Sequence, residues 1–375
     1  MNDGLEKRDT YIDALKGIAI CGVIMVHSSN GNEQLPLLLQ GVAAIGKFGT
    51  QLFLLISALL SFKSYEHYFV NKNNSVENNV RWLIKKFIKL IPLYYVSLSI
   101  GMLQGGASYW LGNEGHITVG NVFSHLFFLH GLFPHYANSI IGIEWYLGVL
   151  GIFYIATPFL FRKINSLEKS IMWFVIAVII CYIFNNLCLD KVPIVDSYIY
   201  TSYISTFCFS AQFPVMLLGV VLYFILKSLN NIKKKKIFSY VLLLLSVGLT
   251  GGIALVYRNI FGMGDLYNKI YWLTSSTLFG MCFFVLVFSQ SLNSCFIIDN
   301  IVFRFLGQYS YPIYLFHCYL IGIYRQYISL NLVDNAVLCW VIEYIIIIII
   351  SLIVAILITE ILKVFQKLVK KRKIF

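Results

Sequence analysis

The chain has 375 residues, of which 59% are hydrophobic and only 12% charged, and its mean hydropathy is +0.77. A soluble domain normally carries about a quarter charged residues, so this composition excludes a soluble globular protein. The net charge of +12 comes from basic residues between apolar runs, which is typical of cytoplasmic loops. No zinc-finger spacing or basic pattern rich in aromatic residues indicates nucleic-acid binding. The eight cysteines lie mostly within apolar runs without a framework spacing, so we expect packing roles and no disulfides.

Ten apolar segments are long enough to cross a bilayer at about 20 residues each. The predicted fold is therefore an all-α polytopic membrane bundle in one domain (residues 1–375), ending in a basic tail (residues 363–375). The stretch from Val122 to Phe133 is too short to cross and is predicted to be re-entrant or interfacial. In chain order the predicted spans are Tyr11 to Ser28, Val42 to Phe62, Lys85 to Leu103, Ile141 to Phe161, Ile171 to Leu187, Ser205 to Leu226, Ile237 to Tyr257, Ile270 to Ser291, Tyr309 to Ser329, and Ala336 to Leu362.

The distribution of Lys and Arg sets the expected orientation. With the N-terminus inside, 23 of the 29 basic residues lie on the cytoplasmic side, including the Lys233 to Lys236 run, and five lie outside. Both termini are therefore predicted to be cytoplasmic. An impermeant thiol reagent is then expected to reach Cys188 from outside but not Cys295.

The first predicted span contains three ionisable residues, Asp13, Lys16 and His27. Ionisable groups inside a span cost roughly 2.5–3.5 kcal/mol and usually face a cavity or a partner. Lys16 and His27 are eleven residues apart, which places them on one helix face about 16 Å apart, and Asp13 can pair with Lys16 at i,i+3. From spacing alone, snorkelling of Lys16 to the inner interface and an interfacial role for His27 explain the pattern equally well.

The third predicted span opens with Arg81, Lys85, Lys86 and Lys89, followed by Pro92. A basic helix start at the inner leaflet is typical of contact with anionic lipid. It equally suits the phosphates of a nucleotide-bearing donor, which Arg and Lys bind. The residues alone favour lipid contact.

Polar residues also occur in the later spans. Glu144 begins the fourth span at its outer end and Glu343 lies near the outer end of the last. Each can position an acceptor sugar, but the residues alone favour a simple place in the interface. In the ninth span, Ser310 and His317 share a face, and the residues alone favour a buried histidine bonded to a neighbouring hydroxyl over a site. The outer-loop histidines have no ligand spacing, so no metal site is predicted; these are His116, His125, His130 and His135.

Five stretches, in order over about 320 residues, together resemble the acyltransferase-3 family of membrane acyltransferases. The chain departs from the family pattern at three positions. Lys16 stands where the family often has Arg, and Ala58 stands where it usually has glycine. Leu150 stands where many members have a glutamate, so the role of that glutamate cannot be assigned to this chain. The stretches are Tyr11–Ile20 with His27, Gly49–Leu60 with Ser57, Lys85–Tyr95, Trp145–Leu147 continuing to Phe153, Tyr154 and Pro158, and Leu306–His317.

The resemblance implies transfer of an acyl group from cytoplasmic acetyl-CoA or a similar thioester to a hydroxyl of a cell-surface or lipid-linked carbohydrate. It implies His27 as general base, supported by Lys16 and Asp13, because histidine titrates near neutrality. No bound cofactor is expected, and the expected location is a bacterial plasma membrane. Lys85, Lys86 and Lys89 are the predicted donor-binding residues, and Glu144, Trp145, Ser310 and His317 the predicted substrate-binding residues.

A transporter or flippase for a lipid-linked saccharide is the alternative, because ten spans with a polar stripe also suit a translocation path. Paired discontinuous helices would favour transport, and the sequence has no such symmetry and no Walker A motif. A purely structural membrane subunit does not account for three ionisable residues on one face of a span. Neither the acyl group, the acceptor nor the oligomeric state follows from the sequence.

Overall fold

The computed structural model describes residues 9–30, 32, 34–71, 75–112, 115–189, 191–229, 236–257, 275–327 and 335–372. Over these residues the chain is helical and contains no strand, which confirms the all-α prediction. Nine of the described helices or helix runs are long and apolar enough to cross a membrane. The predicted ninth span is present as α15 (Ser310–Tyr327), but its tyrosines, His317 and Arg325 make it too polar to be one of those nine.

Two compact units make up the chain. The first consists of Met1–Leu52, Lys234–Gly262 and Val285–Phe375, and the second of Phe53–Lys233 and Met263–Phe284. Helices α3 (Gly49–Asn71) and α13 (Ser275–Leu292) contribute residues to both.

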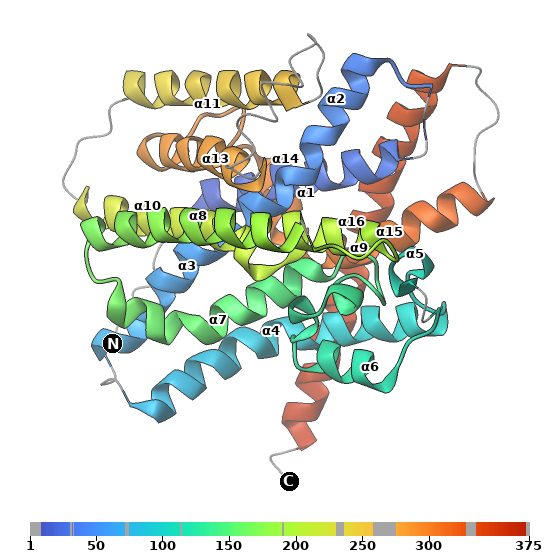
Figure 1. The fold of residues 1–375 in the computed structure, drawn as a ribbon, viewed down its shortest axis with the longest axis horizontal. Coiled ribbons are helices and arrows are strands. Elements are labelled where there is room, and N and C mark those ends of the chain that lie inside the picture. The colour runs from blue at the N-terminus through green and yellow to red at the C-terminus, as the bar shows by residue number, and fades with distance from the viewer. Residues whose placement is uncertain are drawn as a thin grey trace. The chain divides into compact units, whose positions relative to one another are not determined.

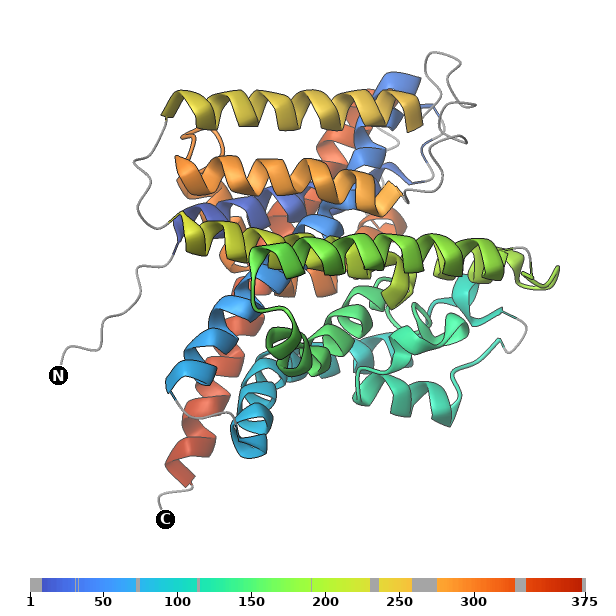
Figure 2. The same cartoon turned by 60° about the vertical axis from the view of Figure 1, so that its left-hand side comes forward.

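The first unit is built around α1 (Thr10–Ser29), which contacts α14 (Ile301–Gln308), α15 and the 3-10 turn η1 (Gly46–Phe48). The short α2 (Leu37–Ile45) and the long α16 (Ala336–Arg372) also contact α1. Helix α11 (Lys236–Tyr257) runs beside the C-terminal half of α13 (Figure 2). Ser239 and Ser289 join these two helices by donating to each other's backbone carbonyls at 2.9 Å.

Two glycines allow α1 and α14 to approach backbone to backbone. A Cβ on Gly17 would lie 2.0 Å from the carbonyl oxygen of Phe303, and a Cβ on Gly307 would lie 1.7 Å from that of Asp13. No side chain fits either position, so glycine is required at both by the close crossing. This crossing fixes the segment of α1 that carries Asp13 and Lys16.

The second unit contains α4 (Val76–Leu103), α7 (Trp145–Lys163), α8 (Leu167–Leu189) and α10 (Phe209–Ser228), and α8 runs alongside α10 (Figure 1). Before α10 lie α9 (Ser197–Ser202) and a π-helical turn, η5 (Tyr203–Phe207). Among the residues that the structure describes between α4 and α7, every helix is short, so the predicted non-crossing stretch is too short to span. These are α5 (Ser108–Leu111), α6 (Val119–Leu126), η3 (His130–Leu132) and η4 (Pro134–Tyr136).

Three helices expose most of their apolar surface. In α8, α11 and α16 only 17% of the most apolar window is buried within the protein. A helix that is apolar all round and exposed in this way needs an apolar solvent. These three helices therefore present the surface that faces lipid.

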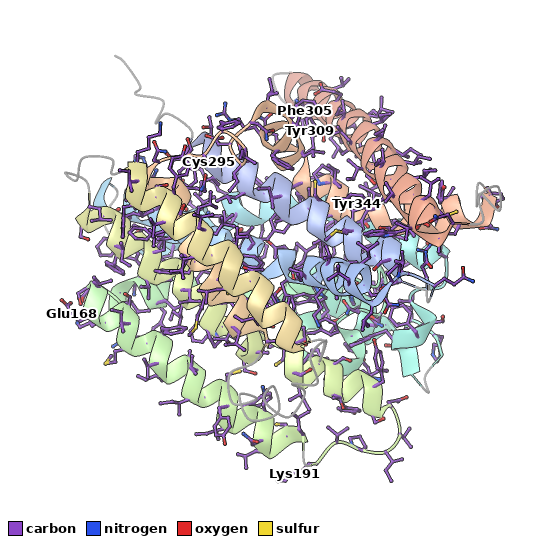
Figure 3. The ribbon with its side chains drawn as sticks, turned by 90° about the horizontal axis from the view of Figure 1, so that it is seen from above. Glu168, Lys191, Cys295, Phe305, Tyr309 and Tyr344 are labelled. Carbon is purple, nitrogen blue, oxygen red and sulfur yellow. The ribbon has the colours of Figure 1, made fainter. Side chains whose placement is uncertain are left out.

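The predicted orientation can be tested at the two ends of α8, which Glu168 and Lys191 mark (Figure 3). Cys295 is buried, so it would escape a thiol reagent on either side and is a poor reporter. We expect an impermeant maleimide added to intact cells to label Lys191→Cys above the wild-type level, and Asn165→Cys only after permeabilisation. Both positions are exposed. The opposite labelling pattern would reverse the assigned topology.

Candidate functional site

Within the first unit, α1 and α15 bring two histidines together. His27 lies in the last turn of α1, half-buried, and His317 is fully buried at mid-length of α15. Their ring centroids are 5.2 Å apart, with the ring planes tilted by 55°. Positions 290 residues apart in the sequence thus form a histidine pair.

Backbone contacts set the hydrogen-bonding roles of His317. Its Nδ1 lies 2.8 Å from the carbonyl oxygen of Tyr314 and 3.2 Å from that of Ile313, both of which can only accept. Nδ1 therefore carries the proton, and Nε2 of the neutral ring is an acceptor that faces the thiol of Cys318 at 3.4 Å. The expected bond to Ser310 is not formed, because the Ser310 hydroxyl donates to the carbonyl of Gly307 at 2.8 Å.

The other predicted site residues on α1 lie in its N-terminal half. Asp13 is buried and Lys16 is half-buried. They occupy the segment held by the crossing with α14 described above. The structure thus places the predicted stripe of Asp13, Lys16 and His27 on a helix that is packed on several sides.

A cation holds the C-terminal end of α1. The guanidinium of Arg325 donates to the carbonyl of Ser28 at 2.8 Å and to the carboxylate of Glu343 at 3.0 Å. Tyr344 (labelled in Figure 3) also donates to the carbonyl of Cys21 at 3.3 Å. The last carbonyls of a helix lack internal partners and attract cations. Sequence reasoning missed Arg325, and it left Glu343 between a sugar contact and an interfacial residue; here Glu343 anchors that arginine.

In the second unit, the basic start of α4 is lined by aromatic rings. The Lys86 ammonium lies 5.0 Å from the ring centroid of Trp82 and 5.4 Å from that of Tyr154, and Lys85 lies 5.0 Å from that of Tyr68. Lys85 and Lys89 are exposed, whereas Lys86 is half-buried. Such rings hold a cation in place without neutralising it.

Two further matched stretches meet inside the second unit. The hydroxyls of Ser57 on α3 and Tyr146 on α7 are 3.4 Å apart. Trp145, next to Tyr146, is buried, and its backbone N–H donates to the side-chain oxygen of Asn138. Ala58 lies where α3 crosses α10, and Gly219 lies opposite it. Because Gly219 has no side chain, the two helices cross closely although position 58 is alanine and not glycine.

Glu144, which sequence reasoning left between an acceptor contact and an interfacial residue, is fully buried within the protein just before α7. Its carboxylate accepts hydrogen bonds from the backbone N–H groups of Ile140, Ile141 and Ile143 at 2.7, 3.1 and 2.9 Å. It also lies 3.2 Å from Nε2 of His125. Burial would raise the pKa of Glu144, but the bond to His125 and the charge of that ring, with the backbone donors, lower it below its usual value.

His125 completes this buried cluster. Its Nδ1 faces the carbonyl of Asn121 at 2.8 Å, and its Nε2 faces the carboxylate. Since both partners accept, both ring nitrogens donate, which is the geometry of the imidazolium. His130 stacks on this ring at 4.3 Å and bonds through Nε2 to the backbone carbonyl of Glu144 at 2.9 Å. Burial and the neighbouring His125 lower the pKa of His130 to about 3, so it stays neutral.

The cluster of His125, His130 and Glu144 joins α6, η3 and the start of α7. The spacing of the outer-loop histidines gave no sign of it, because the pairing depends on how the loop folds back. It is a buried ion pair with every donor and acceptor used. We infer that it positions the beginning of α7 and its Trp145–Leu147 stretch.

Taken together, the apolar spanning helices, the ionisable residues of α1 and the pair formed by His27 and His317 describe a polytopic membrane protein with polar side chains packed between its helices. Residues 9–360 match the family model of the acyltransferase-3 family, described as an acyltransferase domain. The chain belongs to this family and is an acyltransferase. Comparison with curated proteins and with solved structures gave no match.

Proposed function

We propose that the protein transfers an acetyl or similar acyl group from a cytoplasmic CoA thioester to a hydroxyl of a cell-surface or lipid-linked carbohydrate. The observation that carries this proposal is the close pair formed by His27 on α1 and His317 on α15. Helix α1 also contains Lys16 and Asp13. The family membership supports acyl transfer, and the basic, aromatic-lined start of α4 supports a donor that bears phosphates. The proposed location is a bacterial plasma membrane.

In the proposed reaction His27 accepts the proton of the acceptor hydroxyl as its oxygen attacks the thioester carbonyl. The new C–O ester bond forms, the C–S bond breaks, and the CoA thiolate leaves and takes up a proton. The ring centroid of His317 lies 5.2 Å from that of His27, and its Nε2 can accept a hydrogen bond, so His317 suits binding of a second hydroxyl of the acceptor carbohydrate beside the base. Lys16 and Asp13 are proposed to maintain the electrostatics of α1, and the hydroxyl of Ser310 belongs to the turn that begins α15.

Lys85, Lys86 and Lys89 are proposed to bind the phosphates of the donor. Lys86 is the best positioned of the three, because Trp82 and Tyr154 hold its ammonium. The roles of Glu144 and Trp145 in acceptor binding stay predictions. The carboxylate of Glu144 already accepts hydrogen bonds from backbone N–H groups of the protein. We therefore propose that Glu144 contributes to acceptor binding indirectly, by positioning Trp145.

The test is transfer of labelled acetyl from acetyl-CoA to extractable glycan in membranes that contain wild-type protein, His27→Ala at equal expression, or no protein. Transfer by the wild type that the variant loses would support both the reaction and its base. Transfer that the variant retains would keep the enzyme class but refute His27. Absence of any acetyl transfer would refute acetyl-CoA as donor, and other thioesters and the flippase alternative would then be tested.

Replacement of Lys86 by glutamine is expected to raise the KM for the acyl-CoA donor about 10- to 100-fold, with a smaller change in kcat. A hydrogen bond to a charged group contributes about 1.5–3 kcal/mol, and 1.4 kcal/mol corresponds to a factor of ten. Initial rates against donor concentration measure the effect. Lys169→Gln, at an exposed position on α8, is the matched control and should leave the KM unchanged. An equal effect of both substitutions would show only a general influence of charge.

A further inference from the structure

His27, His317 and Cys318 form a cluster whose side chains are all of metal-binding type. One ligand atom from each lies within 4.8 Å of the others, and His317 Nε2 is 3.4 Å from Cys318 Sγ. Around a tetrahedral zinc ion, with bonds of about 2.0–2.3 Å, neighbouring ligand atoms are roughly 3.3–3.6 Å apart. The histidine and cysteine already meet this spacing, and His27 reaches it by a side-chain shift of about 1 Å.

The histidine in the middle is oriented as a metal ligand. Its Nδ1–H is bound to the carbonyls of Tyr314 and Ile313, which leaves the Nε2 lone pair directed away from the backbone. Metal-binding histidines almost always donate their second ring N–H to a carbonyl or carboxylate in this way, because the bond fixes the tautomer and increases ligand basicity.

The cluster is also accessible. His317 is buried, but His27 and Cys318 are each only half-buried. His27 lies in the last turn of α1, which in the predicted orientation faces the outer aqueous side. Two imidazoles with a thiol select soft or borderline cations such as Zn²⁺ over Mg²⁺ or Ca²⁺, and three protein ligands leave a fourth position open.

We propose that His27, His317 and Cys318 bind one Zn²⁺ ion and that this ion inhibits acyl transfer. Binding deprotonates the thiol and uses the lone pairs of both imidazoles, so a metal-bound His27 cannot accept a proton from the hydroxyl. The inhibitory effect rests on the proposed function of His27, whereas the binding itself does not.

The experiment uses the purified full-length protein in detergent, stripped of metal by a chelator and titrated with Co²⁺ and with Zn²⁺. One Co²⁺ per chain is expected to bind and to give a thiolate-to-cobalt charge-transfer absorption, which Zn²⁺ displaces. The nearly isosteric Cys318→Ser should lose this absorption and bind Zn²⁺ at least about tenfold more weakly, because even the loss of an indirect partner costs 10–100-fold. Cys188→Ser, at a similarly half-buried cysteine, is the matched control and should behave as the wild type.

Absence of stoichiometric binding, or binding that Cys318→Ser leaves unchanged, would overturn the metal site. Inhibition is read separately, as the Zn²⁺ concentration that halves acyl transfer, with each variant normalised to its own chelator-treated rate. Zn²⁺ that binds without inhibiting would overturn the inhibitory role. Because cobalt binding needs no acyl transfer, a protein that binds the ion but transfers nothing would refute the proposed function and leave the metal site standing.

Discussion

Replacement of His27 by alanine is expected to lower kcat for acyl transfer by about 10²–10⁴-fold, the usual contribution of a positioned general base. The KM for the acyl-CoA donor should change little, because proton transfer stabilises the transition state and not the bound donor. The measurement is initial-rate kinetics of labelled acyl transfer in membranes of equal protein content.

A second substitution separates proton transfer from hydrogen bonding at the same position. His27→Gln keeps a polar group of similar size but cannot take up a proton, so it should be about as inactive as His27→Ala. His67→Ala, at an exposed histidine on α3, should leave kcat unchanged. If His27→Gln retained most of the activity, His27 would be a hydrogen-bonding residue and the base would have to be sought elsewhere.

The spanning helices could be predicted from the sequence because hydropathy alone dictates them. Long apolar runs such as those of α8 and α16 have no other stable environment than lipid. The face shared by Lys16 and His27 also follows from helical geometry within one segment. α15 shows the limit, since its polar side chains reduce the hydropathy of a helix that packs closely against α1 and α16.

The histidine pair could be predicted only in part. Both residues were singled out, but no local rule indicates that His317 faces His27, because their meeting depends on how α15 packs against α1. The close crossing at Gly17 and Gly307 holds α14, which directly precedes α15, against α1. Tertiary packing likewise decides the position of Arg325 at the C-terminal end of α1.

Glu144 illustrates a different limit. A carboxylate at the start of an apolar helix is expected at the interface, where water solvates it. Here three backbone N–H groups and His125 replace that water. Such a folded-back loop leaves no periodic pattern in the sequence, so its buried ion pair could not have been predicted.

This cluster predicts a large loss of stability. Glu144→Ala leaves three buried N–H groups and the His125 imidazolium without their acceptor, and removal of one partner of a buried ion pair costs about 3–5 kcal/mol. Glu144→Gln should cost less, because its amide oxygen still accepts although the charge is lost. Glu168→Gln, at an exposed carboxylate on α8 (Figure 3), is the control and should unfold as the wild type does. Thermal unfolding of the detergent-solubilised protein measures these differences.

The same cluster predicts the direction of the pH dependence. The pKa of His130 is lowered from 6.5 to about 3 in the folded protein. Below about pH 6.5 the unfolded chain therefore takes up a proton on His130 that the folded protein does not bind. Stability consequently falls as the pH drops below about 6.5. The pKa of Glu144 is also lowered from its ordinary 4.5, so the stability it contributes is lost as the pH falls through that lowered value. Both effects act in the same direction. The melting temperature should therefore decline from pH 7 to pH 4, and a melting temperature constant over that range would contradict the buried, neutral His130.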